Sequence, residues 1–263
     1  APIKPAPPVI NRFIVLFLYG SLQKYKSFCR HMGCCFSLKP SNEVSSQSQP
    51  MKNTATHMAL KRLFDVLFSL ALLFFVLSWL VPLLWVLTKL DSKGPLFFVQ
   101  EREGINGVPF SCYKFRTLPT DAPPHVPGKA LEAAVSRLGR ILRNSGIDEL
   151  PQALNILKGE MSVVGPRPHL AADNTFFSAA VGADAMRKRQ SVLPGLTGWA
   201  QVQGHKGAAL TSEDIQKRIQ ADLAYIDQQN FWLDTRIVAT SFLMLVRAAV
   251  SKLLAKSAAM MYV

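Results

Sequence analysis

The sequence predicts a helix-rich α+β fold, in which a membrane-embedded, re-entrant helix precedes a cytoplasmic domain with a small β-hairpin and amphipathic interfacial helices. Three observations lead to this prediction. Residues 66–88 form an uncharged, apolar run long enough to cross the hydrocarbon core of a bilayer. Two β-prone runs, residues 96–102 and 108–117, flank the strong turn signal Asn106-Gly107. Several later segments place apolar residues at helical spacing.

Composition narrows the class of protein. The chain has 263 residues, with 30 Lys and Arg against 17 Asp and Glu, so its net charge is +13. Apolar residues make up 49% of it, which excludes a disordered chain. Four cysteines in this length are too few for a disulfide scaffold. The basic balance favours anionic partners, which could be nucleic acid, acidic lipid or a phosphorylated substrate.

We divide the chain into three regions. Residues 1–57 are a basic N-terminal extension that we expect to be poorly ordered, and one hypothesis is that the natural start is Met51 or Met58. Residues 58–93 are a membrane-associated helix. Residues 94–263 are a cytosolic domain that ends in a membrane-surface helix.

The flanks of the apolar run favour a re-entrant helix. Basic residues, which mark the cytoplasmic side of a membrane helix, stand on both sides of the run: Lys61, Arg62, Lys89 and Lys93. Pro82 inside the run removes a backbone hydrogen bond, and Ser78 can bond to freed backbone groups. A helix that enters, breaks near these two residues and returns satisfies both observations. The alternative is an ordinary transmembrane helix with a proline kink.

Further elements follow the hairpin in order. Residues 119–128 hold four prolines and read as a loop. Helices are expected at 131–144, 148–159 and 212–227, and a long apolar helix is expected after residue 230. Its segment 237–246 either lies at the membrane interface or packs on the membrane helix, with a buried core helix as the alternative.

Asp148 and Glu149 are the leading candidates for chemistry. Proline is tolerated only in the first turn of a helix, so Pro151 places both carboxylates at a helix start. Free amides and the helix dipole stabilise negative charge there, and we therefore expect Asp148 to be ionised at neutral pH. The alternative is that Asp148 merely caps the helix.

Four cations stand near this pair in the sequence. Lys114 and Arg116 alternate along a strand and so should share a face. Arg143 precedes Asp148 across a Ser-Gly break, and Arg167 lies between two prolines that stiffen its backbone. Cations around two carboxylates suit phosphoryl transfer with a divalent metal. A surface of ordinary salt bridges is the alternative.

Seven sequence blocks, in order from about residue 60 to about residue 234, resemble the bacterial sugar transferases, the monotopic phosphoglycosyl transferases that start glycan assembly on polyprenyl phosphate. The most distinctive are Lys61-Arg62-Leu63-Phe64-Asp65, Tyr113-Lys114-Phe115-Arg116, Ile147-Asp148-Glu149-Leu150-Pro151-Gln152, Gly165-Pro166-Arg167-Pro168 and Pro194-Gly195-Leu196-Thr197-Gly198-Trp199. The chain is similar to the short form of the family, without the several N-terminal spans of the long form.

The resemblance implies a reaction and a place. A sugar 1-phosphate would pass from a UDP-sugar to undecaprenyl phosphate, with Mg²⁺ as cofactor and UMP as product. This would be the first membrane step of a bacterial surface glycan, at the cytoplasmic face of the inner membrane. Galactose, glucose and N-acetylated or diamino sugars are all compatible with the sequence.

The resemblance also implies roles for residues. Asp148 would attack the sugar-bearing phosphorus, and Glu149 would help to hold Mg²⁺ or manage protons. Lys114, Arg143 and Arg167 match positions that face phosphates, and Asp222 matches a further acidic position. The chain departs from the family at the helix break, where a Ser-Pro pair is usual: here Ser78 is followed by Trp79, and the proline comes at Pro82.

Two other functions compete with this one. A basic, membrane-tethered protein that binds nucleic acid or acidic lipid without turnover would explain the charge and the apolar run. It would not explain a carboxylate pair among cations, and base stacking would call for aromatic residues among the C-terminal bases. We therefore expect no nucleic-acid partner. A phosphatase acting on polyprenyl pyrophosphate is the second alternative.

Overall fold

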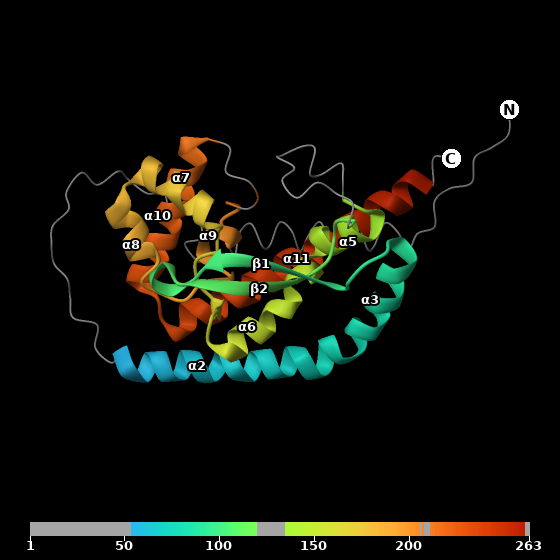
Figure 1. The fold of residues 1–263 in the computed structure, drawn as a ribbon, viewed down its shortest axis with the longest axis horizontal. Helices are drawn as coiled ribbons and strands as arrows, with labels where there is room; N and C mark the ends of the chain where they lie inside the picture. The colour runs from blue at the N-terminus through green and yellow to red at the C-terminus, as the bar shows by residue number, and fades with distance from the viewer. Residues whose placement is uncertain (1–53, 120–134, 206, 208–210, 261–263) are drawn as a thin grey trace, which may run out of the picture. The chain divides into compact units, whose positions relative to one another are not determined.

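The computed structural model describes residues 54–119, 135–205, 207 and 211–260 (Figure 1). Two units make up the chain, Ala1–Met51 and Lys52–Val263, and all described residues belong to the second. Residues 1–53 of the predicted N-terminal extension and most of the proline-rich loop lie outside the described residues. Residues 54–57, which were expected to be poorly ordered, already belong to the first described helix. Within them, the prediction of a helix-rich α+β fold with small sheets is confirmed.

The apolar run forms one long helix with a change of direction. It consists of α2 (Thr54–Ala71), a π-helical turn η1 (Leu72–Leu77) and α3 (Ser78–Asp91). Figure 1 shows α3 leaving the line of α2 at an angle. By length and composition alone, His57–Asp91 is the one helix among the described residues that could cross a membrane. Several large apolar side chains on it are exposed, among them Phe74, Phe75, Trp79 and Trp85.

The irregular part of this helix precedes Ser78 and does not lie at Pro82. π turns kink helices as prolines do, and here the π turn ends at Leu77 while Pro82 lies inside α3. Two side chains bond the carbonyls of this turn. The Ser78 hydroxyl donates to the Phe74 carbonyl at 2.6 Å, and the Trp79 indole N–H donates to the Phe75 carbonyl at 2.8 Å. Trp79, the departure from the family pattern, thus takes part in the turn.

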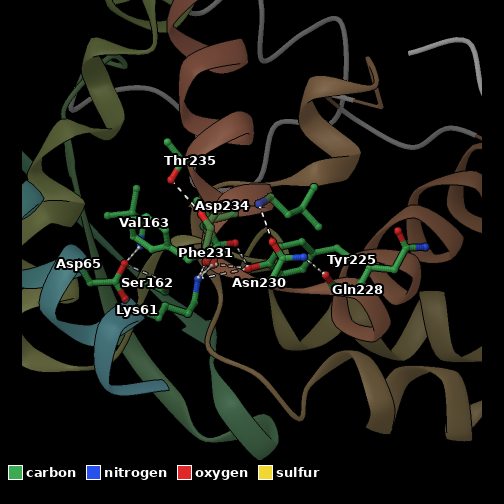
Figure 2. Close-up of polar contacts among 12 residues, drawn as sticks. Lys61, Asp65, Ser162, Val163, Tyr225, Gln228, Asn230, Phe231, Asp234 and Thr235 are labelled. Atoms are coloured by element: carbon green, nitrogen blue, oxygen red, sulfur yellow. Dashed lines mark hydrogen bonds and ion pairs between the residues drawn. The ribbon is translucent and has the colours of Figure 1, made fainter. Parts of the chain in front are cut away.

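The first turns of α2 are bonded to the domain by a buried polar network (Figure 2). Lys61 Nζ donates to Asp234 Oδ2 at 2.7 Å, to the Val164 carbonyl at 2.9 Å and to the Tyr225 hydroxyl at 3.2 Å. The Tyr225 hydroxyl donates in turn to Asp234 Oδ1 at 2.7 Å. One lysine therefore joins the long apolar helix to residues far away in the chain.

Two neighbours of Lys61 complete this attachment. Asp65 Oδ1 accepts hydrogen bonds from the Val163 N–H at 2.8 Å and the Ser162 hydroxyl at 3.0 Å. Arg62 donates to the carbonyls of Ile156 at 2.6 Å and Leu157 at 2.9 Å. The motif at 61–65 thus fixes α2 against two elements that lead to the candidate site.

Replacing Lys61 with methionine is expected to lower the free energy of unfolding by about 3 kcal/mol, because the buried Asp234 side chain would lose its cationic partner. The side chains of Lys61 and Asp234 are only 17% and 3% exposed. Thermal unfolding of detergent-solubilised protein measures the loss. Lys217→Met is the matched control, because Lys217 and its partner Glu213 are exposed and surface ion pairs contribute little to stability. Equal losses in the two variants would contradict a buried anchor.

The predicted hairpin is confirmed. Strands β1 (Phe97–Glu103) and β2 (Pro109–Phe115) pair antiparallel, with the short helix η2 (Ile105–Gly107) between them. Asn106 adopts φ 53°, a left-handed conformation that asparagine tolerates well. A second sheet consists of the short parallel strands β3 (Ser162–Val164) and β4 (Gly195–Thr197). Buried Cys112 on β2 lies in the core.

The prediction of one helix over 148–159 is wrong about the type of helix at its start. A 3₁₀-helix, η3 (Ile147–Gln152), comes first, and α6 (Ala153–Lys158) follows. An α-helix beginning at Asp148 would make its first hydrogen bond from residue 151 to residue 147, and Pro151 has no N–H to donate. The preceding helix α5 (Arg137–Ser145) begins later than expected, because the Ser136 hydroxyl caps it by accepting from the Gly139 N–H at 2.9 Å.

The remaining helices complete the described part of the chain. They are α7 (Ala171–Val181), α8 (Ala183–Arg189), α9 (Trp199–Val202), α10 (Ser212–Gln228) and α11 (Phe231–Met260). Helices α7, α8 and α10 pack together around Phe177, Met186, Ile215 and Ile219. The predictions for α10 and for a long helix after residue 230 are confirmed.

Segment 237–246 of α11 is buried at its start and exposed further along, so each of the two interpretations fits one part of it. Ile237 is fully buried in the main core, as a core helix requires. Further along, large apolar side chains are exposed: Phe242, Leu243, Leu245 and Val246. The helix therefore leaves the core with an apolar surface uncovered, and this is the part that suits a membrane interface.

Candidate active site

Glu149 is the centre of a cluster built from three elements. Lys114 on β2 donates from Nζ to Glu149 Oε1 at 2.7 Å. Arg167, from the segment after β3, grips both oxygens of the same carboxylate, with Nη1 to Oε2 at 2.9 Å and Nη2 to Oε1 at 2.5 Å. Such a bidentate arginine–carboxylate pair fixes the geometry of both partners. Three of the residues predicted from the sequence are thus brought together.

The cations determine the charge of Glu149. Burial alone would raise the pKa of this carboxyl. The charges of Arg167 and Lys114, together with their hydrogen bonds, outweigh burial and hold the pKa well below its usual range. Glu149 is therefore a permanent anion that keeps two cations in place.

Asp148 lies beside this cluster with its carboxylate uncommitted. The residue is 9% exposed, and no group in the described part of the chain hydrogen-bonds to its side chain. Burial and then the charge of Glu149 raise the pKa of Asp148, while Lys114, Arg143 and Arg167 oppose the shift. We expected the helix start to favour the anion, so the direction of this pKa shift is a correction. Its physical reason is desolvation.

Arg143 approaches the site through a close backbone contact. A Cβ atom on Gly139 would lie 2.1 Å from the Thr117 carbonyl oxygen, so only glycine lets α5 pack this closely on the end of the hairpin. This close packing lets Arg143 Nε donate a hydrogen bond to Thr117 Oγ1 at 2.8 Å. Its charge acts on Asp148, as expected for a cation near the carboxylate pair.

Arg116 does not join the cluster. Its guanidinium donates to the carbonyls of Lys93 at 2.6 Å and Ser92 at 3.1 Å, just after the end of α3. Alternate residues share a face only while a strand lasts, and β2 ends at Phe115. The expectation that Lys114 and Arg116 point together into a phosphate site is therefore corrected: Arg116 holds α3 to the hairpin.

The backbone directly before Arg167 is held by hydrogen bonds. The Gly165 N–H donates to the Thr197 carbonyl at 2.9 Å, and the Gly195 N–H donates to the Pro166 carbonyl at 2.8 Å. These two glycines lie so close that a Cβ on Gly195 would be 2.1 Å from the Gly165 nitrogen. Arg167 is thus presented from a rigid segment, which agrees with the stiffness predicted from its two prolines.

Asp222 lies away from Glu149 and pairs with Arg189, from Nε to Oδ2, at 2.8 Å. Arg189 also donates from Nη2 to the Arg167 carbonyl at 2.7 Å. The sequence shows Arg189 only as part of the basic run at 187–189, so its place behind Arg167 could not be found from that pattern. Asp222 therefore contacts the cluster only through Arg189.

A shallow hollow of about 180 Å³ opens over the cluster, and Arg102, Cys112, Lys114, Glu149, Gln152, Arg167 and Pro168 line it. Among the described residues, no three His, Cys, Asp or Glu side chains gather to hold a metal. Both oxygens of Glu149 are already bonded to cations, which leaves Asp148 as the available carboxylate. A metal here would need other ligands, which a substrate carrying phosphates supplies.

A half-buried arginine–glutamate pair beside an aspartate that no other side chain binds, on a domain attached to a long apolar helix, is an arrangement suited to contact with phosphate groups. A family model for bacterial sugar transferases matches residues 56–248, and the chain belongs to that family.

Curated relatives agree with this assignment. The chain is 43% identical over 180 residues to a UDP-glucose:undecaprenyl-phosphate glucose-1-phosphate transferase of Caulobacter vibrioides, covering 68% of this chain and 66% of the relative. It is 42% identical over 190 residues to an undecaprenyl-phosphate glucose phosphotransferase of Komagataeibacter xylinus, covering 68% and 34%. A UDP-N-acetylgalactosamine-undecaprenyl-phosphate N-acetylgalactosaminephosphotransferase of Aeromonas hydrophila is 39% identical over 155 residues, covering 58% and 36%. The chain thus spans between about a third and two thirds of the length of these relatives.

Proposed function

We propose that this protein transfers a sugar 1-phosphate from a UDP-sugar to undecaprenyl phosphate and releases UMP. The observation that carries the proposal is the pairing of an uncommitted carboxylate, Asp148, with a neighbour that Lys114 and Arg167 lock in place. A binding protein without turnover has no use for this division of roles between adjacent carboxylates. The names of the relatives supply the substrate classes.

The proposed reaction has two displacements at one phosphorus. A carboxylate oxygen of Asp148 attacks the phosphorus that bears the sugar, and the bond from that phosphorus to the bridging oxygen of the UDP-sugar breaks, releasing UMP. The sugar phosphate then remains on Asp148 as an acyl phosphate. A phosphate oxygen of undecaprenyl phosphate attacks the same phosphorus, which regenerates the carboxylate and forms the polyprenyl diphosphate sugar.

The cations would stabilise charge on the phosphate oxygens in both steps. Arg167 and Lys114 each have further N–H groups that do not donate to Glu149 and could donate to the substrate. Arg143 adds a third positive charge nearby. Because Glu149 holds the first two cations before substrate arrives, little reorganisation accompanies the reaction. We assign Glu149 this orienting role.

Asp148, together with the phosphates of the substrate, would hold Mg²⁺ at this site. This ion is commonly held by one or two carboxylates together with substrate phosphates, and Asp148 offers the carboxylate that no other group engages. Glu149 is the weaker ligand candidate, because Lys114 and Arg167 occupy its oxygens. When bound, the metal would neutralise charge on the diphosphate.

Release of UMP tests the proposal. Purified full-length protein is incubated with undecaprenyl phosphate, Mg²⁺ and a panel of UDP-sugars that includes UDP-glucose and UDP-N-acetylgalactosamine, the sugars named in the relatives. UMP release that needs the polyprenyl acceptor for sustained turnover supports the transferase. Release of inorganic phosphate from polyprenyl diphosphate without UMP would indicate a phosphatase, and no product in either assay would favour a binding protein.

We further propose that the catalytic domain lies at the cytoplasmic face of the bacterial membrane, in contact with membrane lipid, and that the bent helix re-enters that face. The support is the basic flank at each end of the apolar run and the π turn at its bend.

Single cysteines at Met58 and Asp91, both exposed, test this topology in a variant with serines at Cys29, Cys34 and Cys35. In intact cells both cysteines should resist a membrane-impermeant maleimide, and both should react after permeabilisation. A cysteine at the exposed Glu213 of α10 is the reference for the side on which the domain lies. Labelling of only one of the first two sites in intact cells would instead mean that the helix spans the membrane.

A further inference from the structure

A buried ion pair lies directly behind Arg167. The side chains of Arg189 at the end of α8 and Asp222 on α10 are only 4% and 2% exposed, and their Nε and Oδ2 atoms are 2.8 Å apart. Burying two charges is costly unless further hydrogen bonds satisfy the remaining polar groups. The other contacts of Arg189 therefore show which groups supply these further hydrogen bonds.

Those contacts lead to the segment that presents Arg167. Arg189 Nη2 donates to the Arg167 carbonyl at 2.7 Å and lies 3.1 Å from His169 Nδ1. Burial, and next the charge of Arg189, hold the pKa of His169 well below its usual range, so its ring is neutral and Nδ1 can accept. The ring also packs edge-on against Phe177, with centroids 4.9 Å apart. One guanidinium thus bridges α10 to two residues of this segment.

The chemistry of the Arg167 carbonyl makes this contact important. The peptide unit between Arg167 and Pro168 has no N–H, so its carbonyl oxygen is the only polar group by which that unit can be held. Arg189 supplies the hydrogen bond to it. On the other side of the same residue, the Arg167 side chain grips Glu149 through two hydrogen bonds. The orientation of the clamp therefore depends on a backbone that Arg189 fixes.

We propose that Arg189, oriented by Asp222, is a positioning residue that sets Arg167 for phosphate binding. This inference rests on the proposed transferase function and assigns Asp222 a role through Arg189 in place of direct contact with substrate. Neither residue needs to touch the substrate, because each acts on the backbone of the residue that does.

Arg189→Lys tests the proposal, because lysine keeps a cation for Asp222 but lacks the planar fork whose separate Nε and Nη2 atoms reach Asp222 and the Arg167 carbonyl. We expect kcat to fall about 10- to 100-fold, as for residues that orient a catalytic group. The KM for the UDP-sugar should change less. Lys188→Met is the matched control on the same helix, since its partner Asp227 is exposed, and it should keep normal kinetics.

A double-mutant cycle separates positioning from general structural support. Once Arg167 is replaced by lysine, adding Arg189→Lys should reduce the rate by less than about 3-fold further, because coupled residues are not additive. Full additivity of the two losses overturns the proposal. A loss in Arg189→Lys that follows a fall in the amount of folded protein, measured by thermal unfolding, also overturns it.

Hydrogen–deuterium exchange tests the positioning role of Arg189 without a measurement of turnover. Residues 163–170 should exchange faster in Arg189→Lys than in wild type, and Lys188→Met should leave them unchanged. Unchanged exchange in Arg189→Lys overturns the positioning role even if the enzyme is active. If wild-type protein released no UMP, the proposed function would fail, while the exchange result would still decide whether Arg189 orders this segment.

Discussion

Asp148→Asn is expected to reduce UMP release roughly 10⁴-fold or more while the protein stays folded and associated with membrane, because losing a nucleophile removes the covalent route altogether. Asparagine has nearly the shape of aspartate. The carboxylate it replaces makes no hydrogen bond within the described part of the chain, so the change should disturb the fold little. Steady-state UMP release measures turnover, and thermal unfolding confirms the fold.

Asp227→Asn serves as the control for this variant. Asp227 is an exposed carboxylate on α10 whose ion pair with Lys188 lies on the surface, and its loss should leave turnover unchanged. A residual rate within 10-fold of wild type in Asp148→Asn would remove the nucleophile assignment.

Trapping the intermediate distinguishes a nucleophile from a metal ligand. Wild-type protein is incubated with the UDP-sugar and Mg²⁺ but without undecaprenyl phosphate, quenched within seconds, and digested for mass spectrometry. We expect a phosphosugar on the peptide that contains Asp148 and none in Asp148→Asn. No adduct at any time, together with kinetics that require both substrates bound at once, would indicate direct transfer with Asp148 as a metal ligand or general base.

The features that could be predicted from the sequence are those with a local cause. Asn106-Gly107 determines the hairpin turn, because both residues tolerate left-handed backbone. Pro151 limits where a helix can begin, and this brings Asp148 and Glu149 to an element start even though that element is a 3₁₀-helix. The two prolines around Arg167 restrict its backbone wherever the segment lies.

The features that could not be predicted depend on contacts between distant residues. Lys61 and Asp234 are 173 positions apart, and no local pattern pairs them. Arg116 looks equivalent to Lys114 in the sequence, yet the strand ends between them, and Arg116 bonds to the backbone just after α3. The pKa of Asp148 is likewise raised by burial, a property of the folded chain that helix-end reasoning does not contain.

The segment of chain that holds α2 to the domain also leads to the candidate active site. Lys61 and Asp65 bond to β3, and the residues that follow β3 present Arg167. Arg62 bonds to the end of α6, which continues directly from the element that carries Asp148 and Glu149. An enzyme whose acceptor is a membrane lipid must hold its reactive groups at a fixed place relative to the bilayer. These bonds join the apolar helix to both halves of the cluster.

Arg167→Lys is expected to lower kcat/KM about 10²- to 10³-fold, although the positive charge is kept, because removing a preorganised donor to a developing anion costs this much. Arginine presents a planar fork that engages both oxygens of Glu149 while its other N–H groups face the substrate, and lysine has one nitrogen for both tasks. Arg187→Lys, at an exposed position of α8, is the matched control and should keep normal kinetics. UMP release over a range of UDP-sugar concentrations separates the two parameters. If Arg167 served only to neutralise Glu149, lysine would do the same and the rate would stay within a few-fold of wild type. A fall in kcat in a folded Arg167→Lys variant would therefore mean that the planar guanidinium itself stabilises the transition state.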